Sequence, residues 1–266
     1  MSAPETAAPA SSINPEKSSL RPLIAPEINI WSLIVIGLLI MSLGVGLGLL
    51  VFLFDAAATP DIDVADGVNG PIFSEPGIIA LLLAQNAAFA IAVYLVLIRL
   101  QKLPWSALGM RPAKAKWLKL ALAIAILWLP VSMGIEAVIE GQWGVSFDEL
   151  LMKLYAPYGF TWTSALGISF IGGLVAPFCE EILFRGVLFA WLRRHWNLSL
   201  SMIASAAVFA AVHVIPAVMP EIFILGLVMA WLYERSGSIY PAILLHVTNN
   251  LIAFSVLFGS LAFATD

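Results

Sequence analysis

Long apolar runs separated by short polar segments dominate the sequence. A transmembrane helix needs roughly 20 mostly apolar residues, and we interpret seven runs as candidate spans. The seven runs are 30–54, 78–98, 117–135, 164–191, 198–215, 222–233 and 239–263. The fourth run is long and contains Pro177, and the sixth is short, so either could be broken or re-entrant, and an eighth partial segment remains open. The pattern predicts an all-α fold, a polytopic bundle of about seven transmembrane helices.

The composition supports a membrane protein. Of the 266 residues, 61% are hydrophobic and 11% are charged, whereas soluble domains carry about 25% charged residues. The only cysteine, Cys179, excludes an internal disulfide and is expected to be a small buried apolar residue. The sequence has no basic arm and no stripe of alternating basic and aromatic residues, so we expect no nucleic-acid partner.

The segments between the runs alternate in charge. Residues 55–75 include five acidic residues and no Lys or Arg, whereas residues 99–116 include five basic residues and no acid. Residues 136–149 are acidic again, and Arg193 and Arg194 follow the fourth run. Because basic loops tend to stay on the cytoplasmic side, the alternation predicts a cytoplasmic N-terminus and a C-terminus on the outside.

The chain divides into three parts by composition. Residues 1–28 are rich in Ala, Pro, Ser and Glu, which is typical of a disordered segment, and we expect a cytoplasmic tail. Residues 29–159 include the first three spans and have no chemical motif. Residues 160–266 carry several ionisable and amide side chains inside apolar runs, and we expect the functional core there.

Three ionisable side chains lie in the fourth run, where a charge costs about 2.5–3.5 kcal/mol on insertion scales and is usually functional. Glu181 and Arg185 are four residues apart, so they share a helix face and can neutralise each other. Glu180 points about 100° away from Glu181 on a helix, so the two glutamates are not expected to reach the same place. Glu180 therefore needs a partner from outside its own helix, namely a histidine, a metal ion or water.

The other candidates for one site are His213, His246 and Asn250. Counted from the predicted cytoplasmic helix ends, these residues and Glu180 lie at depths between roughly 12 and 22 Å. In one dry cavity, Glu180 could accept a proton from water, the imidazoles could hold that water or a divalent metal, and the amide could donate to an oxyanion. Each residue alone is more commonly a helix-packing contact. The combination of three such clusters in three spans is what indicates a single site.

Three motifs in these runs resemble, in order and spacing, those of the CPBP intramembrane proteases. This family comprises the type-2 CAAX prenyl endopeptidases and their bacterial relatives, also called the Abi family. The resemblance covers about residues 160–262, and Pro177 before the glutamates and Gly186 after the arginine also match. The motifs are Glu180-Glu181-x-x-x-Arg185, Phe209-x-x-x-His213 and His246-x-x-x-Asn250.

The resemblance implies a membrane-embedded metalloendopeptidase with a site that opens toward the cytosol. Glu180 would activate the water and His213 would assist it, while His246 and Asn250 would stabilise the oxyanion or bind metal. The implied ligands of a divalent metal, expected to be zinc, are Glu180, His213 and His246. The two remaining charged residues of the first motif would support the site as an ion pair.

The resemblance also implies a setting and leaves alternatives open. The expected substrate is a membrane-associated peptide or protein, prenylated in CAAX processing, and the expected location is a bacterial cytoplasmic membrane. Some family members act without catalysis, so a membrane immunity or scaffold protein is the main alternative. A transporter or proton relay would also place acids and histidines in spans, but the sequence shows no inverted repeat in its favour.

Overall fold

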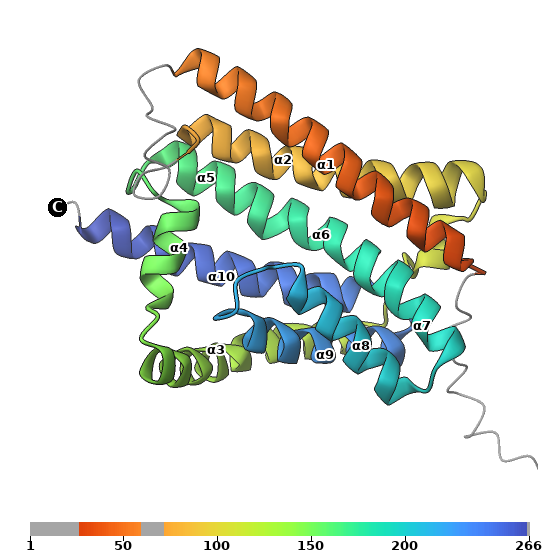
Figure 1. Cartoon of the computed structure of the whole chain (residues 1–266). Helices are drawn as coiled ribbons and strands as arrows, with labels where there is room; N and C mark the ends of the chain where they lie inside the picture. Colours follow the sequence, from red (N-terminus) through yellow and green to blue (C-terminus); the bar gives the residue numbers. More distant parts are fainter. Residues whose placement is uncertain (1–26, 60–71, 265–266) are drawn as a thin grey trace, which may run out of the picture.

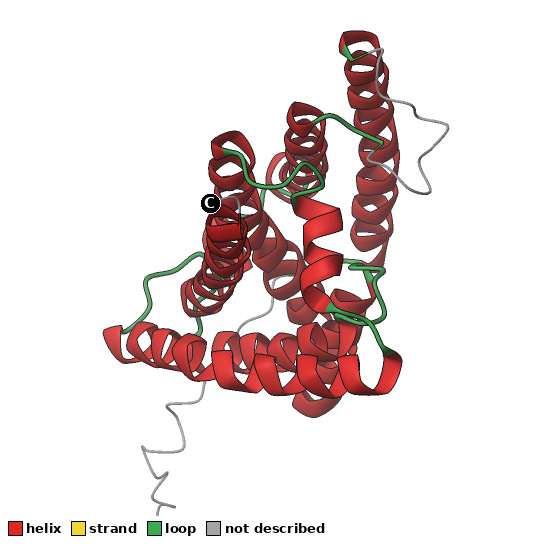
Figure 2. Ribbon diagram, turned by 90° about the vertical axis from the view of Figure 1, so that its left-hand side faces the viewer, coloured by secondary structure: helices red, strands yellow, loops and turns green. Residues whose placement is uncertain are grey.

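The fold is a bundle of helices (Figure 1). The computed structural model describes residues 27–59 and 72–264, and this part of the chain has helices, turns and loops but no strand (Figure 2). The all-α prediction is confirmed. The α-helices in chain order are α1 (Ile30–Ala58), α2 (Glu75–Val93), α3 (Ala115–Trp143), α4 (Phe147–Tyr155), α5 (Trp162–Phe170), α6 (Ala176–Glu181), α7 (Ala190–His195), α8 (Leu198–Ala211), α9 (Met219–Ser236) and α10 (Tyr240–Ala264). They are joined in places by the π-helical segments η3 (Tyr94–Leu100), η5 (Ile171–Val175) and η6 (Ile182–Phe189), and η4 (Trp105–Leu108) is a short 3₁₀ helix.

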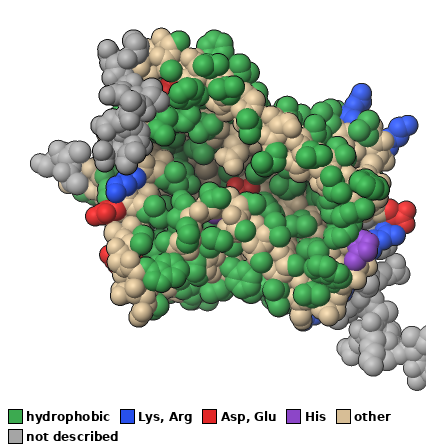
Figure 3. All heavy atoms as spheres, viewed as in Figure 1, with side chains coloured by type: hydrophobic (Ala, Val, Ile, Leu, Met, Phe, Trp, Pro, Cys, Tyr) green, Lys and Arg blue, Asp and Glu red, His purple; other side chains and the backbone are tan. Residues whose placement is uncertain are grey.

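Within the described residues, 27–59 and 72–264, five helical stretches are long and apolar enough to cross a membrane. Much of their apolar surface is exposed: only 6% of the most apolar 18-residue window of α1 is buried, and Figure 3 shows hydrophobic side chains over most of one face. Apolar surface of this extent fits lipid and not water. The protein is therefore an integral membrane protein. The five stretches are Ile30–Ala58, Glu75–Leu100, Ala115–Trp143, Trp162–His195 and Tyr240–Phe263.

The fifth and sixth predicted spans are helices, but they differ from the prediction in length. α8 has 14 residues and ends before a turn in which Val214 has a φ of 52° and Pro216 follows, and proline cannot continue a helix. α9 has 18 residues, more than the predicted run, and ends at Gly237 in the left-handed conformation, a common helix stop. Neither helix meets the length and composition of a full span.

The fourth predicted span is one continuous helix of 34 residues, Trp162–His195. Pro177 does not break it. Instead the helix alternates between α and π geometry, with η5 before the glutamates and η6 after them. Because π-helical turns inside α-helices are frequent at functional sites, this local geometry already marks the segment that carries the two glutamates.

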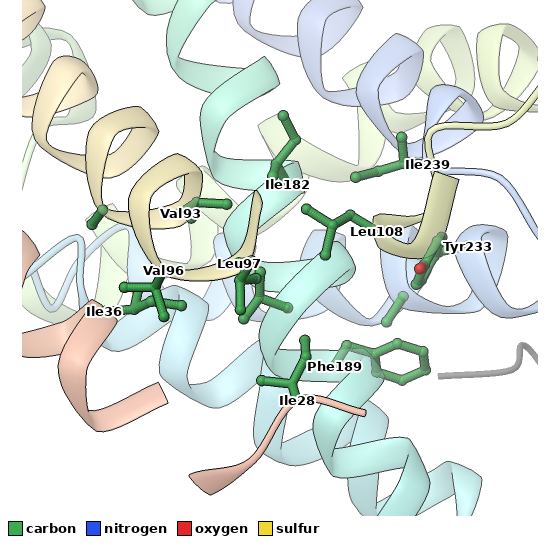
Figure 4. Close-up of a cluster of buried hydrophobic side chains, with 13 residues drawn as sticks. Ile28, Ile36, Val93, Val96, Leu97, Leu108, Ile182, Phe189, Tyr233 and Ile239 are labelled. Carbon is green, nitrogen blue, oxygen red and sulfur yellow. The ribbon is translucent and has the colours of Figure 1, made fainter. Parts of the chain in front are cut away.

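The loop before α3 packs into the bundle behind η6 (Figure 4). Leu108 is 0% exposed, and its backbone carbonyl approaches Gly186 so closely that a Cβ atom there would lie 2.7 Å from the oxygen. Only glycine allows this contact. Gly109 has a φ of 85°. Its N–H donates to the Ser106 carbonyl, and its own carbonyl accepts from the N–H of Ile239, just before α10. The loop thus fixes the position of η6.

Two acidic residues hold helices together at the opposite end of the bundle. Asp55 accepts a hydrogen bond from the N–H of Ser74, just before α2, at 2.8 Å, and Glu75 accepts one from the N–H of Ser164 in α5 at 2.8 Å. Carboxylates are favoured at helix N-termini, where the orphan N–H groups carry partial positive charge. In the sequence, these acids served only to predict orientation in the membrane. In the structure they also join α1, α2 and α5.

The end of the predicted tail contacts the folded part. Glu27 forms an ion pair with Arg194 at 2.8 Å, and Ile28 is 3% exposed and belongs to a core cluster. The sequence placed both residues in the tail because the apolar run begins only after them. The rest of the predicted tail, residues 1–26, lies outside the described residues.

Candidate active site

A buried ion pair lies in the fourth span. Arg185 Nη1 is 2.6 Å from Glu181 Oε1, and both residues are 0% exposed. Arg185 Nη2 also donates to the Gly226 carbonyl of α9 at 3.2 Å, and the guanidinium carbon lies 4.4 Å from the centre of the Phe209 ring. A buried charge pair persists only where further contacts offset its desolvation. The Gly226 carbonyl and the Phe209 ring provide such contacts to Arg185. The predicted pairing is confirmed.

His246, on α10, lies between the two glutamates and is 4% exposed. Its Nδ1 is 3.0 Å from Glu181 Oε1, and its Nε2 is 3.8 Å from Glu180 Oε2. The outside partner that Glu180 required is therefore a histidine. The expectation that the adjacent glutamates cannot reach the same place was wrong, because one imidazole offers two nitrogens and can contact both.

The hydrogen-bond partners of the two histidines indicate their tautomers. An ionised carboxylate only accepts hydrogen bonds, so His246 Nδ1 donates to Glu181. The unprotonated Nε2 then faces Glu180 Oε2 across 3.8 Å without a hydrogen bond between them. His213 has the same arrangement, with its Nδ1 2.8 Å from the Phe209 carbonyl oxygen. An imidazole held through one nitrogen presents the other in a fixed direction, as in metal sites and acid–base pairs.

The Phe209 ring joins the groups of the site. It makes edge-to-face contacts with His213 at 5.0 Å, with His246 at 5.7 Å and with Phe184 at 4.9 Å between ring centres, and the Arg185 guanidinium lies over it. The predicted fifth span, 198–215, included His213, but α8 ends at Ala211 and His213 lies in the turn just after it. The sequence assigned Phe209 no role of its own, although its four-residue spacing from His213 was the available signal.

Asn250 lies one helical turn after His246 on α10 and contacts the backbone of the fourth span. Its Nδ2 donates to the Gly172 carbonyl in η5 at 3.0 Å. Its Oδ1 is 3.5 Å from the amide nitrogen of Asn249, a distance at which a hydrogen bond is weak. Asn250 and His246 thus both join α10 to the fourth span: Asn250 contacts the main chain, and His246 contacts the glutamates.

Tyr155, at the end of α4, is a candidate that the sequence missed. Its ring packs edge to face on Phe254 of α10 at 5.2 Å. Burial raises the pKa of its phenol to about 12, and the negative charge of Glu180 adds to the rise, so the phenol stays protonated. Ser146 caps α4 by accepting from the Glu149 N–H, which is a helix signal, but nothing in the linear sequence connects Tyr155 with the site.

Only one of the two glutamates is accessible. The Glu180 side chain is 19% exposed, whereas that of Glu181 is 0% exposed. Figure 3 shows a hollow in the apolar surface with acidic and histidine side chains visible in its depth. Glu180 is therefore the carboxylate that water or a substrate can reach.

A separate apolar cavity of about 360 Å³ lies on the other side of the glutamate helix. From that helix it is lined by Phe178, Cys179 and Ile182, a helical face that points away from Glu180. Cys179 was expected to be buried; it is half-buried and lines this cavity. The cavity does not border the candidate site.

The expected metal ligands fit a divalent ion in their chemistry and only partly in their arrangement. Within residues 27–59 and 72–264, no group of three or more His, Cys, Asp or Glu side chains is arranged to hold a metal. Two of the expected ligands, Glu180 and His246, are 3.8 Å apart, near the separation of about 3.4 Å between two ligands of a tetrahedral zinc. His213 contacts the Phe209 ring, which also touches His246, and His213 would have to approach Glu180 and His246 to complete the set.

Comparison with known proteins supports the assignment of this region. Residues 160–252 match the family model described as type II CAAX prenyl endopeptidase Rce1-like. The chain contains an Rce1-like segment. This confirms the resemblance drawn from the three motifs, and at the level of the family it supports a CAAX-type intramembrane protease acting on membrane-associated substrates. No significant match was found among curated proteins or solved structures.

The Rce1-like segment contains every residue of the three motifs, from α5 to the middle of α10. Tyr155, on α4, precedes it, as do the first three predicted spans. The segment therefore accounts for the buried ion pair and the histidines, while Tyr155, whose pKa is raised in part by the charge of Glu180, comes from a part of the chain that the family model does not cover.

Proposed function

We propose that the protein is an intramembrane endopeptidase in which Glu180 activates a water molecule. The observation that carries the proposal is the contact between Glu180, the accessible carboxylate, and His246, whose orientation is fixed by the buried Glu181–Arg185 pair. A reactive carboxylate beside an oriented imidazole is the arrangement that general acid–base catalysis needs.

In the proposed reaction, Glu180 takes a proton from water and the resulting hydroxide attacks the carbonyl carbon of the scissile peptide bond. The carbonyl electron pair moves to oxygen, and the tetrahedral intermediate collapses when the C–N bond breaks. Glu180 then returns the proton to the leaving amine. When no metal is bound, His246 Nε2 accepts a hydrogen bond from the attacking water. We assign the assisting role to His213, which contacts the same Phe209 ring as His246.

The developing negative charge needs a donor. Tyr155, whose phenol keeps its proton because burial and the charge of Glu180 raise its pKa, is our candidate for that role. Asn250 was also expected to donate to the oxyanion; one of its two amide hydrogens bonds to the Gly172 carbonyl.

We also propose that Glu180, His213 and His246 hold a divalent metal, with zinc as the expected ion. When bound, such a metal would lower the pKa of a coordinated water and polarise the substrate carbonyl. The Nδ1 contacts of both histidines to Glu181 and to the Phe209 carbonyl are the kind of support that metal-ligating imidazoles have.

The proposed setting is a bacterial cytoplasmic membrane with the basic 99–116 loop and the N-terminus in the cytoplasm and the C-terminus outside. The charge alternation supports this orientation. The proposed substrate is a lipid-anchored, for example prenylated, peptide whose scissile bond enters the site from the membrane. The apolar surface around the hollow (Figure 3) suits such a substrate.

The test is cleavage of a farnesylated CAAX-type peptide by purified protein in lipid nanodiscs, with an unmodified peptide as a second substrate. Glu180→Gln should lower kcat by about 10²–10⁴-fold, the usual contribution of a general base, without changing the Tm. Glu140→Gln alters an exposed acid of α3 and should leave turnover unchanged. A folded wild-type protein that cleaves neither peptide would favour the non-catalytic scaffold instead.

A further inference from the structure

The Gly172 carbonyl lacks the backbone donor that its helix would normally supply. In η5 the hydrogen bonds run five residues back, and the N–H of Ala176 accordingly bonds to the carbonyl of Ile171. One residue further, the N–H of residue 177 would bond to Gly172. Residue 177 is a proline, and proline has no N–H.

Asn250 supplies the missing donor. Its Nδ2 lies 3.0 Å from the Gly172 oxygen, the distance of an ordinary N–H···O bond. Inside a membrane no bulk water replaces a lost donor, and prolines in spans are tolerated where side chains of neighbouring helices bond the freed carbonyl. The side-chain amide of Asn250 therefore stands where the backbone amide of residue 177 would be.

We propose that Asn250 is a positioning residue that compensates for Pro177 and thereby fixes Glu180 relative to His246. Glu180 follows Pro177 by three residues, so a change of helix direction at the proline would move its carboxylate. His246 and Asn250 are one turn apart on α10 and hold the fourth span at two points, Glu181 and Gly172, each at 3.0 Å. Two contacts from one rigid helix define where the Glu180 turn lies.

Two glycines allow α10 to approach the fourth span closely enough for the Asn250 and His246 contacts. A Cβ atom at Gly172 would lie 2.9 Å from the Phe254 ring, and one at Gly173 would lie 2.6 Å from the Leu251 side chain. Both distances are shorter than real Cβ contacts. Glycines, proline and asparagine thus form one unit: the glycines permit the approach, the proline frees the carbonyl, and the asparagine binds it.

The test is a double-mutant cycle of Asn250→Ala and Pro177→Ala, with Tm and kcat/KM as readouts. Asn250→Ala leaves the Gly172 carbonyl without a donor, which should lower the Tm by about 2–6 °C and kcat/KM by about tenfold or more. Pro177→Ala restores a backbone N–H, so the double variant should regain most of both losses. Pro130→Ala, a proline removal inside α3, should not rescue Asn250→Ala.

Equal losses in Asn250→Ala and in the double variant would overturn the proposal. Recovery of the Tm without recovery of turnover would also overturn it, because Asn250 would then act directly on the oxyanion. If Asn250→Ala does not fold, folding and turnover of the double variant supply the expected recovery. The activity readout rests on the proposed function; a wild-type protein without cleavage would refute that function, while the Tm cycle would still decide whether Asn250 replaces the missing N–H.

Discussion

The Glu181–Arg185 pair gives the sharpest prediction, because stability and activity should respond to it differently. Arg185→Met removes the cation and leaves Glu181 as a buried, uncompensated charge. Both residues are 0% exposed, so solvent cannot screen the loss. Removing one partner of a buried pair costs about 3–5 kcal/mol. At roughly 2 °C per kcal/mol for a chain of this length, we expect the Tm to fall by about 6–10 °C.

Replacing both partners should restore stability and still abolish function. In Glu181→Gln/Arg185→Met no buried charge is left unpaired, and such replacements are often neutral or stabilising. The Tm should therefore return toward the wild-type value. The ionised acceptor that orients His246 is lost, however, so kcat should stay low.

The assay is thermal unfolding in detergent beside peptide cleavage in nanodiscs. The matched control is Arg193→Met, which breaks the partly exposed pair with Glu234 at 3.1 Å. A partly exposed pair contributes only about 0–1 kcal/mol, so this Tm should change little. An unchanged Tm in Arg185→Met would refute the buried-charge reasoning, and full activity in the double variant would refute the role assigned to Glu181.

Three further outcomes are expected. Metal analysis of purified protein should find about one divalent ion per chain in the wild type and none in His213→Ala or His246→Ala; equal content in all three would contradict the proposed ligands. Tyr155→Phe should lower kcat about tenfold or more with little change in Tm. Because the Tyr155 phenol titrates at about 12 in the folded protein and near 10 when unfolded, wild-type stability should fall between about pH 10 and 12, and that fall should be smaller in Tyr155→Phe. Phe209→Leu removes the ring that touches both histidines and should lower kcat more than it raises KM; an unchanged kcat would deny Phe209 a positioning role.

Much of the fold could be predicted from periodicity and length, because lipid requires helices whose backbone groups are satisfied internally. The prediction was less accurate where tertiary contacts set the helix ends. α8 stops early at the turn that carries His213. The helix α4 was missed because it is short and begins in the 136–149 segment, which had been interpreted only by its charge.

The candidate site was predictable where its residues lie on one helix. The four-residue spacing of Glu181 and Arg185 predicted their pairing. The contact of His246 with both glutamates could not be predicted, because it depends on how α10 crosses the fourth span. Tyr155 was missed for the same reason: it comes from a separate helix, and no local pattern connects it to Glu180.

The buried ion pair is better explained by what it does to His246 than by stability. A pair of apolar residues of similar volume would be about as stable as Glu181 and Arg185, or more so, so packing alone does not require the charges. An apolar residue would offer no acceptor for the hydrogen on His246 Nδ1, whereas Glu181 Oε1 accepts from both Arg185 and His246. Arg185 donates to Glu181 Oε1, and the same oxygen accepts from His246 Nδ1, which directs the other imidazole nitrogen toward Glu180. The two adjacent glutamates thus have different tasks because one is buried beside an arginine and the other is partly exposed.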